Sequence, residues 1–193
     1  LMAGYARYTV VLDACVLYPA PLRDLLLSLA AEELFCARWT ERIHQEWTSN
    51  LLARRPDLSA EKLARTVALM NAAVDDCLVR DYEYLVETLA LPDPDDRHVL
   101  AAAIVGHADA IVTFNRKDFP AAVLSLHGLD VLHPDDFLID QYHYDPIFFL
   151  STVKANRQRL RNPPKTAVDL IATYEQQGLP QTCAALRDAL ALI

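Results

Sequence analysis

Short apolar segments alternate with longer segments of helical periodicity in the first part of the chain, and this alternation limits the fold more than any other feature. Residues 8–12 form an apolar, β-branched run that ends at Asp13, as a buried strand would. Similar runs occupy residues 33–37, 110–113 and 129–132. Strands that alternate with helices predict βαβ units, in which a parallel sheet carries helices on both faces.

The helices between these runs have recognisable ends. Thr40 is a suitable N-cap for a helix that stops near Pro56. Asp93 followed by Pro94 is typical of an N-cap with proline at the first helical position, and this second helix is expected to end near Gly106. In such folds, ligands bind outside the carboxyl ends of the strands.

The charge distribution changes near residue 137. Residues 1–136 hold 21 acids and 12 bases, whereas residues 137–193 hold 5 acids and 6 bases and have a helical pattern throughout. We therefore expect a core domain over residues 8–136 and a helical C-terminal extension over residues 137–193.

Composition excludes several classes of protein. The chain is 53% hydrophobic with only 4 glycines, which argues against disorder and against a collagen-like chain. No apolar run approaches the roughly 18–20 residues of a membrane span, and the first residues lack a signal-peptide pattern. The 4 cysteines are scattered, so we expect reduced thiols in a cytoplasmic protein that does not associate with membranes. The net charge of −8 argues against indiscriminate binding to nucleic acid.

Acidic, amide and hydroxyl side chains are expected near one edge of the sheet, where they follow predicted strands or lie in the helices beside them. Each has a local explanation, as a helix cap, a turn residue or a solvated helix side chain. In chain order they are Asp13, Glu46, Asp96, Thr113, Asn115 and Asp118. Gathered together, such carboxylates repel unless a cation neutralises them. Oxygen ligands favour Mg²⁺ or Mn²⁺, and the matching chemistry is metal-assisted attack of water on a phosphodiester.

Four segments carry a resemblance to a known family. They are Val11-Leu12-Asp13, the helix that contains Glu46, the run Asp96–Ala103, and Ile111–Asn115. In their order and spacing, the sequence resembles the PIN-domain family, and specifically the VapC-type ribonuclease toxins of bacterial toxin–antitoxin systems. The resemblance extends over about residues 8–136.

The resemblance implies a three-layer α/β/α fold and an endoribonuclease that uses Mg²⁺ or Mn²⁺. By this likeness, Asp13 and Asp96 would bind the metal, and Glu46 would complete the acidic site and help orient or deprotonate water. Asn115 stands where many members have a fourth acid. An amide can coordinate a metal but cannot take a proton, so Asp118 in the same turn is a candidate substitute.

The resemblance also implies partners: an RNA substrate, a cognate antitoxin and a second copy in a homodimer. The C-terminal extension is similar to one found in a subset of the family. Its bases are candidates for gripping RNA phosphates, with a solvated helix face as the alternative: Lys154, Arg157, Arg159 and Arg161. Asp95 is an alternative to Asp96 in the alignment of the acidic helix.

Other interpretations account for less of the sequence. A haloacid-dehalogenase-like phosphatase needs a second aspartate two residues after the first, where this chain has Cys15. A receiver domain needs a lysine at a strand end, and Lys117 is displaced from that position. A non-catalytic PIN-like module that binds RNA or a partner remains open, because Asn115 replaces the fourth acid.

Overall fold

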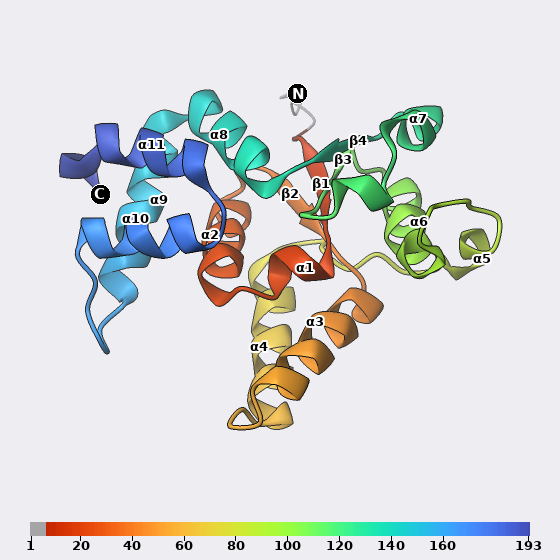
Figure 1. The fold of residues 1–193 in the computed structure, drawn as a ribbon, viewed down its shortest axis with the longest axis horizontal. Helices are drawn as coiled ribbons and strands as arrows, with labels where there is room; N and C mark the ends of the chain where they lie inside the picture. The colour runs from red at the N-terminus through yellow and green to blue at the C-terminus, as the bar shows by residue number, and fades with distance from the viewer. Residues whose placement is uncertain (1–6) are drawn as a thin grey trace, which may run out of the picture.

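The computed structural model describes residues 7–193, and its centre is a parallel sheet (Figure 1). The strands are β1 (Thr9–Leu12), β2 (Cys36–Arg38), β3 (Ala110–Val112) and β4 (Asp130–Leu132). Their order is β2-β1-β3-β4, and all neighbours are parallel. The predicted α/β class is confirmed.

The two central strands, β1 and β3, are apolar along their lengths because both faces of the sheet are covered. Val11 pairs with Ile111, and neither has measurable exposure. Parallel strands buried on both faces have continuous apolar sequences rather than alternating ones. The helix α6 packs on β1 and β3, whereas α2 packs on β2, and the two helices lie on opposite sides of the sheet (Figure 1).

The helices that precede the C-terminal extension vary in length. They are α1 (Ala14–Leu17), α2 (Ala20–Ala31), α3 (Glu41–Arg54), α4 (Ala60–Ala73), α5 (Glu83–Val86), α6 (Arg97–Val105) and α7 (Ala121–Leu124). Three short 3₁₀ turns lie at Pro94–Asp96, Arg116–Asp118 and Ser125–His127. As predicted, Thr40 caps α3, and its side chain accepts a hydrogen bond from the Ile43 amide at 3.1 Å.

Two predicted boundaries were wrong. The strand expected at 33–37 is β2, which begins only at Cys36, because Glu33 has a left-handed backbone (φ 67°) and belongs to the turn after α2. The helix expected from Pro94 starts as a 3₁₀ turn that Asp93 caps, and it becomes α-helical at Arg97.

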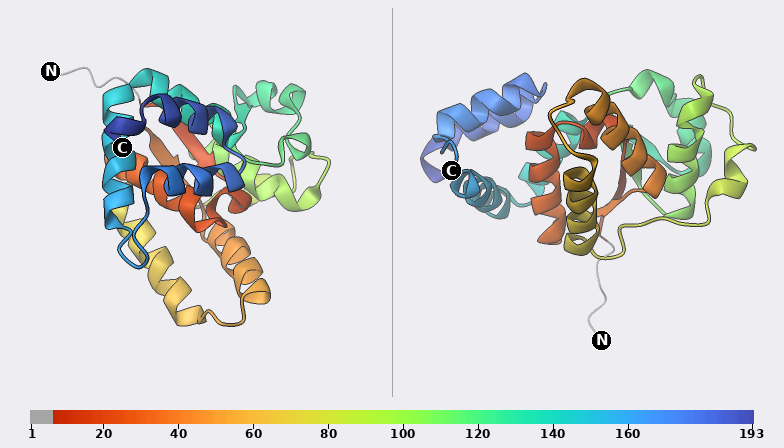
Figure 2. Two further views of the ribbon diagram at one scale, coloured as in Figure 1. Left: turned by 60° about the vertical axis from the view of Figure 1, so that its left-hand side comes forward. Right: turned by 90° about the horizontal axis from the view of Figure 1, so that it is seen from below.

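Four helices form the C-terminal extension: α8 (Pro134–Tyr144), α9 (Pro146–Arg159), α10 (Ala167–Gln176) and α11 (Pro180–Asp188), followed by a 3₁₀ turn at Leu190–Leu192. The boundary expected at residue 137 falls inside α8, because Pro134 at the first helical position starts that helix earlier. The helix α9 packs on α2, and α11 packs on α8 and α10. Figures 1 and 2 show α9, α10 and α11 beyond α2, away from the sheet. Within residues 7–193, no helix is long and apolar enough to cross a membrane.

One buried carboxylate joins the start of the extension to its end. Asp135, in the first turn of α8, is 2% exposed. It accepts hydrogen bonds from the Gln181 amide at 2.8 Å, the Thr182 amide at 2.9 Å and the Thr182 hydroxyl at 2.8 Å. These amides are in the first turn of α11, where a negative charge is favourable. Asp135 therefore fixes α11 against α8.

Asp135→Asn should lower the free energy of unfolding by about 2 kcal/mol, because an amide nitrogen then faces a backbone donor and the charge is lost. Urea denaturation followed by circular dichroism measures this change. Asp140→Asn, on the exposed side of the same helix, is the control and should change stability by less than about 0.5 kcal/mol. Equal stability of the two variants would show that Asp135 does not hold the extension.

Candidate active site

The carboxyl ends of β1 and β3 place two polar side chains in contact. Asp13 follows β1 and Thr113 follows β3, and both are buried. The Asp13 amide donates to the Val112 carbonyl at 3.1 Å, which continues the strand pairing to the edge of the sheet. The Thr113 hydroxyl donates to Asp13 Oδ2 at 2.7 Å. Strand pairing thus sets the position of this carboxylate.

Neutral donors surround the Asp13 carboxylate. Oδ2 accepts from the Cys15 thiol at 3.1 Å as well as from Thr113, and Oδ1 accepts from the Ala14 amide at 2.6 Å. Burial and the nearby Asp13 charge raise the pKa of the Cys15 thiol to about 12, so the thiol keeps its proton. These bonds fix the Asp13 side chain without neutralising its charge.

Asp96 lies at the start of α6, close enough to other carboxylates to be affected by their charges. Burial, and after it the charges of Asp13, Asp93 and Asp118, raise the pKa of this carboxyl from 3.8 to about 6. His98 acts in the opposite direction. Asp13, Asp93, Asp96 and Asp118 therefore share one electrostatic environment at this edge of the sheet.

Glu46, on α3, is partly exposed and is held from α6. Glu46 Oε1 lies 2.8 Å from His98 Nε2 and 3.3 Å from Arg42 Nε. His98 is not a surface residue, because its side chain is 1% exposed. The remainder of α6 after His98, Val99–Val105, is apolar on every side, and such helices are buried all round.

The turn after β3 separates its two candidate residues. Asn115 is exposed, and its side chain makes no hydrogen bond with the described part of the chain. Its amide donates to the Thr113 hydroxyl at 3.0 Å. Asp118 is half-buried and is one of the charges that act on Asp96. The structure therefore brings Asp118 into the electrostatic environment of the other carboxylates, whereas Asn115 is exposed at the start of the same turn.

The comparisons with known proteins agree with this geometry. The family model described as PIN domain matches residues 9–117, more than half of the chain. The chain belongs to the PIN-domain family. A second model, described as VapC50 C-terminal domain, matches residues 134–188. The α8–α11 unit is therefore similar to the corresponding part of VapC50.

A curated relative gives the same assignment over part of the chain. "Putative ribonuclease VapC50" of Mycobacterium tuberculosis (strain ATCC 25618 / H37Rv) is 38% identical over 92 residues, which are 48% of this chain and 54% of that protein. The match thus spans about half of the relative's length. No solved structure matches the chain.

The donor chemistry of this PIN domain fits a hard divalent cation. The candidate ligands are carboxylate oxygens, which Mg²⁺ and Mn²⁺ prefer. The charges of Asp13, Asp93 and Asp118 contribute to the raised pKa of Asp96. A bound cation would offset the repulsion among these carboxylates. In residues 7–193, no group of three or more His, Cys, Asp or Glu side chains is arranged so that it could hold a metal ion.

The predicted RNA-contacting bases do not join the carboxylates. Lys154 donates to the Leu192 carbonyl and Arg157 to the Lys165 carbonyl. Arg159 donates to Asn156 at 2.5 Å and to Ser28 of α2 at 3.4 Å. Arg161 is exposed in the loop between α9 and α10. Three of these four bases thus hold the extension together or attach it to α2.

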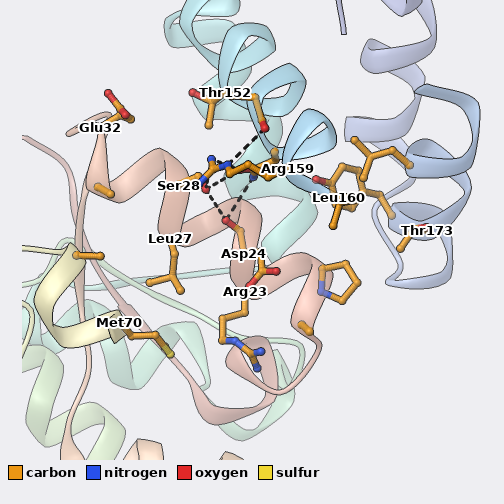
Figure 3. Close-up of a pocket in the computed structure, with 18 of the residues that line it drawn as sticks. Arg23, Asp24, Leu27, Ser28, Glu32, Met70, Thr152, Arg159, Leu160 and Thr173 are labelled. Atoms are coloured by element: carbon orange, nitrogen blue, oxygen red, sulfur yellow. Dashed lines mark hydrogen bonds between the residues drawn. The ribbon is translucent and has the colours of Figure 1, made fainter. Parts of the chain in front are cut away.

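A groove of about 750 Å³ between α2, α4, α9 and α10 is separate from the carboxylates. Figure 3 shows Arg159 and Ser28 on one wall, with Asp24 beside them. Burial raises the pKa of Asp24, and Arg23 and Arg159 partly counteract this. The groove is lined by none of the candidate active-site acids.

Asp96→Asn should stabilise the metal-free protein by roughly 1–2 kcal/mol at about pH 7.5. The folded protein holds the Asp96 proton more tightly than the unfolded chain, with a pKa near 6 against 3.8. The parent therefore loses stability as pH rises from about 4 to 6, and the advantage of the asparagine is complete above pH 6. Urea denaturation in chelator at several pH values measures it. An advantage that is independent of pH would contradict this electrostatic explanation.

Proposed function

We propose that this protein is a Mg²⁺- or Mn²⁺-dependent endoribonuclease. The observation that carries the proposal is the gathering of carboxylates at this edge of the sheet, where burial and then the charges of Asp13, Asp93 and Asp118 raise the pKa of Asp96 to about 6. Membership of the PIN-domain family and the ribonuclease name of the relative support it. In this proposal the nuclease domain is residues 8–136 and residues 137–193 are its helical extension, with the boundary inside α8, which begins at Pro134.

Each side chain has a role in this proposal. Asp13 and Asp96 hold the metal, which when bound supplies an activated water and neutralises phosphate charge. Glu46 orients or deprotonates the attacking water, and Asp118 adds a further carboxylate. Thr113 keeps Asp13 in place through its 2.7 Å hydrogen bond. Asn115 contributes an amide oxygen from the exposed side of the turn.

The biological setting follows from the same family. We propose that the protein is the toxin of a type II toxin–antitoxin system and acts on RNA in the cytoplasm. Its partners are then a cognate antitoxin and a second copy of the chain. The similarity of residues 134–188 to the VapC50 C-terminal domain supports this assignment.

RNA cleavage by the purified chain tests the enzyme. With Mg²⁺ or Mn²⁺, the parent should cleave RNA, and chelator should abolish the activity. Asp13→Asn and Asp96→Asn should each reduce kcat/KM by more than about 100-fold, because even indirect partners of metal ligands cost roughly 10–100-fold. Asp140→Asn should match the parent.

The non-catalytic alternative predicts a different result. A PIN-like module that only binds RNA would retain RNA in a filter-binding assay and leave it intact with either metal. Cleavage that is equal in the parent and in both aspartate variants would instead come from a contaminating nuclease. Either result would overturn the proposed enzyme.

The extension's contact with RNA is a separate proposal. Arg161 is the base of this group that is exposed and free of hydrogen bonds to the described chain. Arg161→Ala should make the plot of log affinity against log salt shallower by about 0.7, the loss of one single-strand phosphate contact. Arg157→Ala, which removes a bond to Lys165, should leave that slope unchanged. An unchanged slope in both variants would show that residues 154–161 do not contact RNA phosphates.

A further inference from the structure

His98 connects the two helices that carry the acidic side chains. It is the second residue of α6, two positions after Asp96, and its side chain is 1% exposed. Its Nε2 lies 2.8 Å from Oε1 of Glu46 on α3. The other ion-pair partner of Glu46 among the described residues is Arg42, whose side chain is 43% exposed. His98 is therefore the fixed contact of this carboxylate.

The surroundings of Nδ1, the other ring nitrogen of His98, decide which of the two nitrogens carries the proton. Nδ1 of His98 is buried and has no hydrogen-bond partner within residues 7–193. A proton on Nδ1 would be a buried donor without an acceptor, which is costly. A proton on Nε2 avoids this cost, because Nε2 faces Glu46 Oε1 at 2.8 Å. The 2.8 Å contact and the unpartnered Nδ1 together point to Nε2 as the nitrogen that carries a proton toward Glu46.

Both donors act on the same oxygen of Glu46. His98 and Arg42 approach Oε1, whereas Oε2 accepts no hydrogen bond from the described chain. A carboxylate held in this way cannot rotate freely, and its second oxygen stays available. We propose that His98 is a positioning residue for Glu46, holding Oε1 so that Oε2 receives the proton of the attacking water.

This inference rests on the proposed nuclease function, in which Glu46 handles the water. It adds a reason for the position of His98 within α6. Because the 3₁₀ turn and α6 carry Asp96 and His98 together, one rigid segment supplies a carboxylate and also fixes the carboxylate from α3. A purely structural histidine would be replaceable by any side chain that fills the same volume.

Two substitutions separate positioning from packing. His98→Leu fills the space without a donor and should lower kcat for RNA cleavage by about 10–100-fold, with KM changed less than about 2-fold. His98→Gln offers an amide N–H and should recover most of the lost kcat. Equal loss in both variants, or full activity in His98→Leu, would overturn the proposal.

A matched control accounts for lost stability. His44, also on α3, is 2% exposed and contacts Asn71 and Trp47 rather than the candidate acids. His44→Leu should destabilise the fold and leave kcat of the folded protein near that of the parent. A kcat loss as large as that of His98→Leu would assign the effect to packing and refute positioning.

Nitrogen NMR of the full chain tests the hydrogen bond independently of activity. In metal-free protein with ¹⁵N-labelled histidines, His98 should show the Nε2–H tautomer. His44 is an internal reference, because its Nδ1 accepts from Trp47 Nε1 at 3.0 Å. Glu46→Ala should shift the His98 nitrogens, whereas Arg42→Ala should not.

The cleavage kinetics and the NMR spectrum together distinguish failure of the nuclease proposal from failure of the positioning proposal. An inactive parent with the expected spectrum would contradict the nuclease and leave the hydrogen bond in place. Two results with an active parent would contradict the positioning role alone. One is a His98 proton on Nδ1, and the other is His98 nitrogen shifts that do not change in Glu46→Ala.

Discussion

The parallel pairing of β1 with β3 is the constraint on which the site depends. It places Leu12 beside Val112, so that the next residues, Asp13 and Thr113, meet at the edge of the sheet although they lie 100 positions apart. The apolar sequence of both strands keeps this register, since each is buried on its two faces. A shift of one strand would remove the hydrogen bond that fixes Asp13 and would turn its apolar residues away from their neighbours.

Local features of the sequence were sufficient for most of the fold. Continuous apolar runs predicted β1 and β3, and Thr40 and Asp93 predicted where helical segments begin. The start of β2 could not be predicted in this way, because it depends on the left-handed turn at Glu33. The family assignment also followed from sequence order, since the matched motifs lie within residues 9–117.

The side-chain arrangement of the site was less accessible from the sequence. Asn115 and Asp118 belong to one polar turn, and only the 3₁₀ conformation of residues 116–118 determines which of them is half-buried. The contact of His98 with Glu46 depends on how α3 crosses α6, which no local pattern encodes. The bases of α9 had a plausible interpretation from composition, but all three, Lys154, Arg157 and Arg159, are hydrogen-bonded within the chain.

Part of the acid excess of residues 1–136 is negative charge at the sheet edge that no basic side chain of the described residues neutralises there. Asp13 receives hydrogen bonds from a hydroxyl, a thiol and an amide, and none of these donors carries a positive charge. They hold the carboxylate in its position but leave its field to act on Asp96, whose pKa burial and the neighbouring carboxylates raise to about 6. An arginine in place of Thr113 would relieve that repulsion and also compete with a metal ion. Neutral donors instead preserve an uncompensated negative charge, and this favours a divalent cation over an internal ion pair.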